Sequence, residues 1–271
     1  MKTIEDIILQ HGQRGMNVLR NHLPADYVRQ AADYILSWQK GKVLLFTGFF
    51  VAGYAETDGP AGTFALADTL RTLGYTPVIV TDEFCRDFFE AEGFEVVYMP
   101  FDAGEDFVQE QLDKLQPVGL ISCERCGKNI EGHYANMRGV VIDDKTAAVD
   151  LFFTLTEGKV PSVGIGDGGN EIGMGNVADV IKNELSLTPC AVKVDKLVIA
   201  AVSNWGAYGL AADLRRVAKA DKLPEAKVVQ EFLARTVKIG SVDGITHEQI
   251  LSVDNFPMEV GSAIIEELRA L

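Results

Sequence analysis

The stretch VLLFTGFFVAGYAETDGPAGTFALADTLRTLGYTPVIV, residues 43–80, contains a strand, a glycine-rich loop, a helix and a second strand. Residues 43–46 are a short apolar run that ends at Thr47-Gly48, which favours a buried strand over a helix. Residues 63–73 have helical periodicity and stop at Gly74, a helix C-terminal signal. Residues 77–80 are the next apolar run. This order is typical of a β–α–β unit with parallel strands.

The same alternation continues through the rest of the chain. Further strands are expected over residues 95–99, 118–122, 162–165 and 197–202, and helices over 83–92, 105–115, 145–157, 208–219, 226–237 and 258–271. The pattern predicts an α/β fold of the Rossmann-like kind, a mostly parallel sheet with helices on both faces. Since no repeat, linker or composition break divides the chain, we expect residues 1–271 to form one domain, with residues 1–40 as a helical N-terminal cap.

Composition narrows the class of partner. The chain has 271 residues and a formal net charge of −14, which disfavours nucleic acid and anionic membranes. An anionic small-molecule substrate then needs local arginine, lysine, backbone N–H groups or a metal to hold it. The amino terminus lacks the apolar core of a signal peptide, and no apolar run reaches the length of a membrane span. We expect a cytoplasmic protein with reduced thiols; the sequence leaves homo-oligomer formation open.

Ligands of such sheets bind beyond the carboxyl ends of the strands, so the loops after strands are the candidate site. The first, residues 49–62, leads into a helix near Thr63, whose free N–H groups suit an anion. Glu56 and Asp58 add carboxylates at its mouth. The alternative is a capped helix with solvated acids. The glycines match neither the dinucleotide nor the P-loop fingerprint.

The second loop is CERCGKNIEGHYANMRG, residues 123–139. Glu124 and Arg125 follow a buried strand, where charges are costly unless they are paired or used. Cys123 and Cys126 form a lone C-x-x-C without the second pair of a zinc ribbon, which favours structural thiols. Arg138 contributes positive charge to the loop.

The third loop, GIGDGGNEIGMG at residues 164–175, is the most specific segment. Glycines allow close backbone approach to a ligand, and they are interleaved here with Asp167, Asn170 and Glu171. These side chains could supply oxygen ligands for Mg²⁺ or Mn²⁺, or acid–base groups. The fourth loop, SNWGAYG at residues 203–209, brings Asn204. Trp205 in the same loop either walls the site or is ordinary packing.

Four segments together resemble a known family. ETDGPAGT (56–63), ERCGKNIEGHYANMRG (124–139), GIGDGGNEIGMGN (164–176) and VSNWGAYGLAA (202–212) are similar to the D-glutamate cyclase C-terminal domain family, formerly a domain of unknown function. The resemblance runs from about residue 40 to the end, with the segments in the same order. It implies a Rossmann-like fold and reversible dehydration of D-glutamate to 5-oxo-D-proline.

That chemistry suggests a role for each candidate residue. Acid–base or metal-ligand roles fall to Asp167, Glu171 and Glu124, with Asp167 and Glu171 as ligands if Mg²⁺ or Mn²⁺ takes part. Guanidinium groups bind carboxylates bidentately, which assigns Arg125 and Arg138 to the substrate carboxylates. The remaining binding residues are Asn170 and Asn204 for the amine, Glu56, Asp58 and Thr63 at the anion end, and Gly168 and Gly169 on the glycine-rich loop. Two alternatives stay open: a metal-dependent hydrolase or phosphoryl-handling enzyme, and a non-catalytic amino-acid sensor.

Overall fold

A computed structural model describes residues 2–12 and 14–271. Its centre is a six-stranded sheet in which every neighbouring pair is parallel. In order across the sheet the strands are β5 (Glu95–Tyr98), β4 (Thr76–Thr81), β1 (Lys42–Phe46), β6 (Gly119–Cys123), β7 (Ser162–Gly166) and β8 (Lys196–Ile199). The predicted α/β fold with a parallel sheet is confirmed.

The strand order fixes where a ligand site is expected. Along the chain the sheet grows outward from β1 through β4 to β5, then returns to the other side of β1 with β6. This is the order of dinucleotide-binding Rossmann sheets, in which ligands bind at the carboxyl ends of the two strands where the direction reverses. Here those strands are β1 and β6, which precede the first and second candidate loops.

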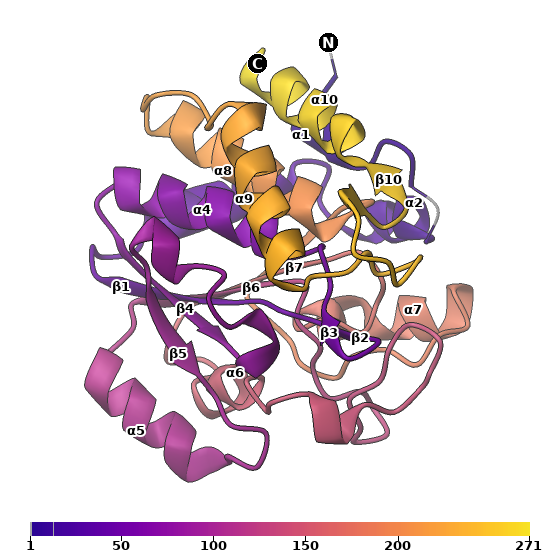
Figure 1. Cartoon of the computed structure of the whole chain (residues 1–271). Helices are drawn as coiled ribbons and strands as arrows, with labels where there is room; N and C mark the ends of the chain where they lie inside the picture. Colours follow the sequence, from indigo (N-terminus) through magenta and orange to yellow (C-terminus); the bar gives the residue numbers. More distant parts are fainter. Residues whose placement is uncertain (1, 13) are drawn as a thin grey trace.

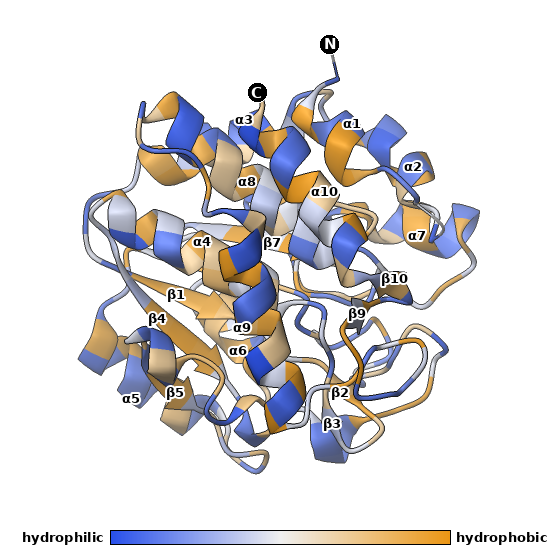
Figure 2. Ribbon diagram, turned by 45° about the horizontal axis from the view of Figure 1, so that its top comes forward, coloured by the Kyte–Doolittle hydropathy of each residue, from blue (hydrophilic) through white to orange (hydrophobic). Residues whose placement is uncertain are grey.

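Helices lie on both sides of the sheet (Figure 1). One side carries α1 (Ile4–Ile8), α3 (Tyr27–Leu36), α4 (Pro60–Thr72), α8 (Ser203–Val217), α9 (Ala226–Ile239) and α10 (Met258–Arg269); the other carries α5 (Glu105–Leu115) and α6 (Leu151–Leu155). The strands are mainly hydrophobic, whereas the helices alternate hydrophobic and hydrophilic residues (Figure 2). A two-sided burial explains why the strands are continuous apolar runs.

Short elements complete the fold. They are the helices α2 (Met16–Leu19) and α7 (Ala178–Glu184), the hairpin strands β2 (Phe50–Val51) with β3 (Tyr54–Ala55), the hairpin strands β9 (Ser252–Val253) with β10 (Phe256–Pro257), and 3-10 turns at Arg20–His22, Glu83–Cys85, Glu90–Glu92, Asp143–Lys145 and Met174–Val177. Among the described residues, no helix is long and apolar enough to cross a membrane.

Three predicted elements differ from the structure. Residues 83–92 form two 3-10 turns instead of a helix, because Asp87 has a positive φ of 65° between them. The helix predicted over 145–157 is restricted to α6, since the Asp150 carboxylate accepts hydrogen bonds from the second loop at Lys128 N (3.1 Å) and Tyr134 Oη (2.5 Å). Residues 203–209, predicted as a loop, are the first turns of α8.

Candidate active site

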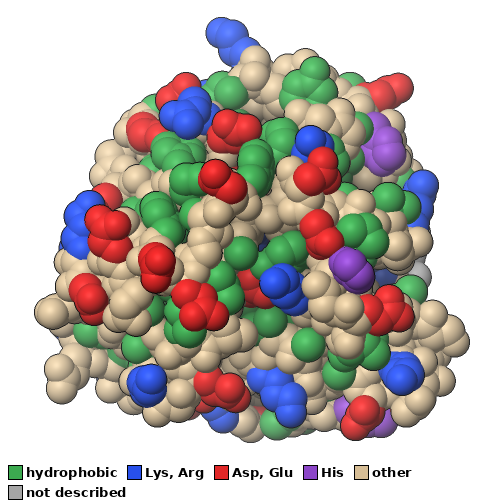
Figure 3. All heavy atoms as spheres, turned by 90° about the horizontal axis from the view of Figure 1, so that it is seen from below, with side chains coloured by type: hydrophobic (Ala, Val, Ile, Leu, Met, Phe, Trp, Pro, Cys, Tyr) green, Lys and Arg blue, Asp and Glu red, His purple; other side chains and the backbone are tan. Residues whose placement is uncertain are grey.

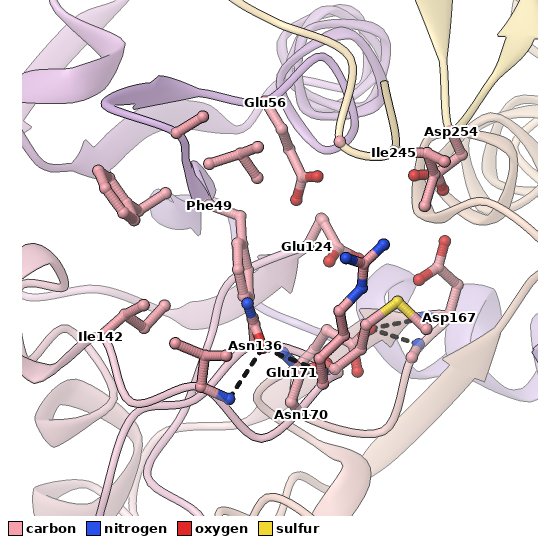
Figure 4. Close-up of a pocket in the computed structure, with 18 of the residues that line it drawn as sticks. Phe49, Glu56, Glu124, Asn136, Ile142, Asp167, Asn170, Glu171, Ile245 and Asp254 are labelled. Atoms are coloured by element: carbon pink, nitrogen blue, oxygen red, sulfur yellow. Dashed lines mark hydrogen bonds between the residues drawn. The ribbon is translucent and has the colours of Figure 1, made fainter. Parts of the chain in front are cut away.

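A cavity of about 200 Å³ lies at the carboxyl edge of the sheet, beside the ends of β1 and β6. It is lined by charged residues from five segments of the chain and by apolar residues from the β2–β3 hairpin and neighbouring loops. The charged residues are Arg14, Glu56, Glu124, Arg138, Asp167, Glu171 and Asp254; the large apolar ones are Phe49, Phe50, Val51, Met137, Val140, Ile142 and Ile245. Figure 4 shows the carboxylates of Glu56, Glu124, Asp167 and Asp254 around one space.

Asp167 follows β7 directly and is fully buried. One carboxylate oxygen accepts a hydrogen bond from Arg14 Nη1 at 2.7 Å, and the other accepts one from the backbone N–H of Ser203 at 3.2 Å. The second guanidinium nitrogen, Arg14 Nη2, lies 2.6 Å from Asp254 Oδ1. Arg14 therefore joins two carboxylates from opposite parts of the chain.

Burial and neighbouring charge raise the pKa values of the Asp167 and Asp254 carboxyl groups toward neutral pH. Burial raises the pKa of Asp167 to about 6, although Arg14 opposes the rise. Burial and the adjacent Asp167 raise the pKa of Asp254 to about 7. A carboxyl group that titrates near the working pH is suited to proton transfer.

Glu124 comes directly after β6 and has a positive φ of 47°. Its buried carboxylate accepts a hydrogen bond from Ser203 Oγ at 2.5 Å. Burial raises the pKa of Glu124 well above its ordinary value, and Asp167 and Glu171 raise it further. Gly59 of the first loop approaches this residue so closely that a Cβ on it would lie 2.9 Å from Glu124 Cβ. The φ of Gly59 is +94°, so glycine is required there.

Glu171 holds the glycine-rich loop in shape. Its oxygens accept backbone N–H groups from Asp167 (3.0 Å), Gly168 (2.5 Å) and Gly169 (2.7 Å). Because three donors already occupy this carboxylate, the geometry favours a positioning role for Glu171 over the acid–base role that we expected. It fixes the backbone that carries Asp167.

Asp58 and Asn204 lie together, outside the cavity lining. Asp58 Oδ1 accepts the N–H of Asn204 at 2.7 Å and Asp58 Oδ2 that of Ser203 at 2.9 Å. Asn204 Oδ1 accepts the N–H groups of Gly59 (3.0 Å) and Gly62 (2.6 Å). Both side chains are thus engaged with the starts of α4 and α8, which differs from the expected contacts with substrate.

Arg125 is also directed away from the cavity. Its guanidinium, buried at 1% exposure, pairs with Asp82 at 2.6 Å and donates to the carbonyl oxygens of Gly48 and Ala147. Arg125 is absent from the cavity lining, so the structure does not bring this guanidinium to the place where we expected it to hold a substrate carboxylate. Arg138, in contrast, is exposed and lines the cavity.

Some of the remaining predicted residues line the cavity, and others are buried outside it. Glu56, Gly168 and Asn170 line the cavity. Asn170 is held there by a hydrogen bond from its Nδ2 to Ala135 O at 2.9 Å. Thr63 and Gly169 are buried outside the lining: Thr63 lies within the first turns of α4, which begins three residues earlier than predicted, and Gly169 packs against Ile181.

The cysteines take no part in this site. All four are buried and free, and burial raises the pKa of Cys126 to about 12. A buried thiol that stays protonated at neutral pH is a poor nucleophile.

Two sets of three carboxylates place oxygens within 4.8 Å of one another. They are Asp58, Asp167 and Asp254, and Glu124, Asp167 and Glu171. In the first set the guanidinium of Arg14 already contacts two members. In the second set Arg14 contacts only Asp167. A divalent cation would therefore compete with this arginine at one carboxylate instead of two.

Sequence reasoning missed Arg14, Asp254 and His247, which also line the cavity. Arg14 lies in the N-terminal segment and Asp254 in the turn between β9 and β10, where it has a positive φ of 53°. Neither residue follows a strand of the central sheet. The expectation that ligands bind beyond the carboxyl ends of the strands therefore could not identify them.

The fold and the cavity define an α/β protein of Rossmann topology with an acidic cavity at the switch point of its sheet. The sequence profile of the "D-glutamate cyclase-like, C-terminal" family matches residues 4–269, so the chain belongs to that family. It is 32% identical over 182 residues to the mitochondrial D-glutamate cyclase of Homo sapiens. The match covers 59% of this chain and 29% of the human protein.

Proposed function

We propose that this protein is a hydro-lyase that catalyses the reversible dehydration of D-glutamate to 5-oxo-D-proline. The observation that carries the proposal is the meeting of Glu124 and Asp167, from the ends of two adjacent strands, in one cavity beside Arg14. Membership of the family and the similarity to a protein named D-glutamate cyclase support the choice of reaction.

The reaction joins the α-amine of glutamate to its own γ-carboxyl carbon. A C–N bond forms, a C–O bond breaks and water leaves, so a proton must leave the amine and another must reach the departing oxygen. A positioned acid–base group contributes about 10²–10⁴-fold to such proton transfers. In the reverse direction water adds to the lactam carbonyl and the ring C–N bond breaks.

Asp167 is the best placed proton acceptor in the cavity. Its pKa of about 6 leaves it largely ionised at neutral pH yet basic enough to take a proton. Arg14 fixes the orientation of its carboxylate. Burial raises the pKa of Glu124 well above its ordinary value, which favours its protonated form, and we assign it to supply a proton to the departing oxygen.

The substrate carboxylates need positive charge that the buried acids do not provide. Arg138 is the cavity arginine without a recorded partner among the described side chains, and it lies at the exposed rim. We assign it to a substrate carboxylate, with Asn170 beside it. The methylene groups of the substrate then lie along the apolar wall that includes Phe49 and Ile142 (Figure 4).

The proposal includes a divalent cation because carboxylates outnumber arginines in the cavity. Five carboxylates and two arginines line the cavity, and the substrate brings two more carboxylates. Mg²⁺ or Mn²⁺, which prefer oxygen ligands, would be held by the carboxylates of Asp167, Glu124 and Glu171. Because a ligand carboxylate must be ionised, a bound cation would take the place of the Glu124 proton in stabilising the departing oxygen. When bound, the cation would polarise the γ-carboxyl group.

The direct test is to incubate the purified protein with D-glutamate and, separately, with 5-oxo-D-proline, with and without Mg²⁺ or Mn²⁺. Chiral chromatography should detect the other member of the pair in both directions, and the L-enantiomers serve as the stereochemical control. If folded protein shows no turnover in either direction, the proposed reaction is rejected. Tight binding of D-glutamate without turnover would instead support an amino-acid sensor.

A further inference from the structure

We infer that Glu56 and Asp254 form an ammonium subsite, which binds the amino group of the substrate and makes the cavity selective for amino acids over dicarboxylic acids that lack the amine. This inference rests on the proposed function for its choice of substrate. It reverses the sequence-based expectation that Glu56 closes the anion end of the site.

Glu56 is held rigidly while its carboxylate is left free. Its backbone N–H donates to Phe49 O at 2.9 Å, and the following N–H, of Thr57, donates to Val242 O at 2.8 Å. The residue is only 7% exposed and lines the cavity, yet its carboxylate receives no hydrogen bond from any described residue. Figure 4 shows this carboxylate directed toward the space above Glu124.

Asp254, which also lines the cavity, has a second unused acceptor. Its Oδ1 is paired with Arg14, but its buried Oδ2 has no hydrogen-bond partner among the described residues. Asp254 is 8% exposed, so water does not compensate freely for the missing donor. A buried acceptor without a donor is destabilising, and a ligand that brings the donor would remove this cost.

Gly244 lies beside the Glu56 carboxylate and beside Asp254 Oδ1, the oxygen that pairs with Arg14. A Cβ built on Gly244 would clash with Glu56 Oε2 and lie 3.3 Å from Asp254 Oδ1. Both oxygens therefore lie beside the same small residue, at the base of the loop that follows α9. The lack of a side chain at position 244 leaves room for these oxygens.

The free carboxylate oxygens of Glu56 and Asp254 favour a ligand that donates hydrogen bonds. Burial and the neighbouring Asp254 raise the pKa of Glu56, and an ammonium group beside it would favour the ionised form. Ionised carboxylate oxygens only accept hydrogen bonds, whereas an ammonium group only donates, with three N–H groups. Arg14 is already shared by Asp167 and Asp254. A substrate carboxylate at this position would therefore be repelled by Glu56, which has no cationic partner among the described residues, and attracted to Arg138 at the rim. The substrate therefore binds with its amine inward, close to Asp167, the group proposed to accept its proton.

The test compares D-glutamate with glutarate, which has the same two carboxylates and no amine. Isothermal titration calorimetry on the full chain should show that D-glutamate binds about 10- to 100-fold more tightly than glutarate, the range that one or two charge-assisted hydrogen bonds provide. Glu56→Gln and Asp254→Asn should each remove most of this preference, chiefly by weakening D-glutamate. Glu110→Gln, an exposed acid on α5, is the matched control and should leave the preference unchanged.

Several outcomes would overturn the subsite. Equal affinity of the wild-type protein for both ligands would do so, as would an equal loss of both in Glu56→Gln. A thermal shift caused by Mg²⁺ alone and abolished by Glu56→Gln would assign these oxygens to a metal instead. If Glu56→Gln does not fold, Gly244→Ala displaces the same carboxylate from its other side and should lower the amine preference.

The same measurements separate this inference from the proposed reaction. Turnover of D-glutamate by a protein that binds glutarate equally well rejects the subsite and keeps the reaction. A clear preference for the amine without any turnover rejects the reaction and keeps the subsite.

Discussion

Asp58 caps the start of α8, which contains Asn204, and Asn204 caps the start of α4, which follows Asp58. Asp58, just before α4, accepts the N–H groups of Ser203 and Asn204 at the start of α8, and Asn204 accepts those of Gly59 and Gly62 at the start of α4. Two helix N-termini thus meet beside Asp167. The partial positive charge of a helix N-terminus favours nearby carboxylates, so this crossed cap helps the cavity to hold its buried acids.

Replacing Asn204 with Ala should lower the free energy of unfolding by about 1–3 kcal/mol, because the buried N–H groups of α4 lose their acceptor. Chemical denaturation monitored by circular dichroism measures the change. Asn183→Ala, on the exposed surface of α7, is the control and should change stability little. If both variants are equally stable, the crossed cap contributes nothing.

Of the two arginines in the second loop, we expect Arg125 to affect stability and Arg138 to affect substrate binding. Arg125→Ala leaves Asp82 as an unpaired buried charge and should cost about 3–5 kcal/mol of stability. Arg138→Ala should preserve the unfolding transition and raise KM for D-glutamate by about tenfold or more, because a charge-assisted contact is lost. A stable Arg125→Ala protein with impaired substrate binding would reverse this division.

Asp167→Asn should keep the fold and lower kcat by about 10²-fold or more, since the amide cannot accept the substrate proton. Steady-state rates in both directions of the reaction measure the effect. Asp144→Asn, a change at an exposed residue outside the cavity, should retain the wild-type rate. Near-normal turnover by Asp167→Asn would show that another group is the base.

Asp254 should make stability depend on pH in a defined direction. Its pKa of about 7 in the folded protein lies above the ordinary value of 3.8, so the folded state binds this proton more tightly than the unfolded chain does. The resulting stabilisation is complete below about pH 4 and is lost as the pH rises through 7. Asp254→Asn cannot ionise and avoids this loss.

Melting temperatures of Asp254→Asn and the wild-type protein should therefore be compared at pH 5 and pH 8. The variant should gain relative to the wild type as the pH rises, by an amount on the order of 2 kcal/mol. A difference that is constant across this range would contradict the raised pKa. Asp144→Asn again provides the control.

Removal of divalent cations should lower the rate if charge balance in the cavity requires them. We expect activity to fall by about tenfold or more after dialysis against a chelator and to return with Mg²⁺ or Mn²⁺. Asp167→Asn protein should show no such recovery. Full activity in the chelated enzyme would leave Arg14 and Arg138 as the cations that act on the substrate.

The strands and the long helices could be predicted closely because their signals are local. The apolar runs at residues 43–46 and 162–165 are confirmed as β1 and β7 almost to the residue, and the helix over 105–115 as α5. The helix start at Ser203 could not be predicted, since its N–H groups are capped by Asp58, 145 residues earlier. A local pattern has no information about an acceptor so distant.

The sequence by itself determined the fold class, the family, and the loops whose acids and glycines belong at the carboxyl edge of the sheet. Tertiary structure alone decided which charges face the cavity: it turned Arg125 inward to Asp82 and brought Arg14 and Asp254 to Asp167. The physical reason is that strand and helix formation depend on side-chain periodicity along the chain. The direction of a buried charge depends instead on which opposite charge or donor the folded chain brings within hydrogen-bond distance.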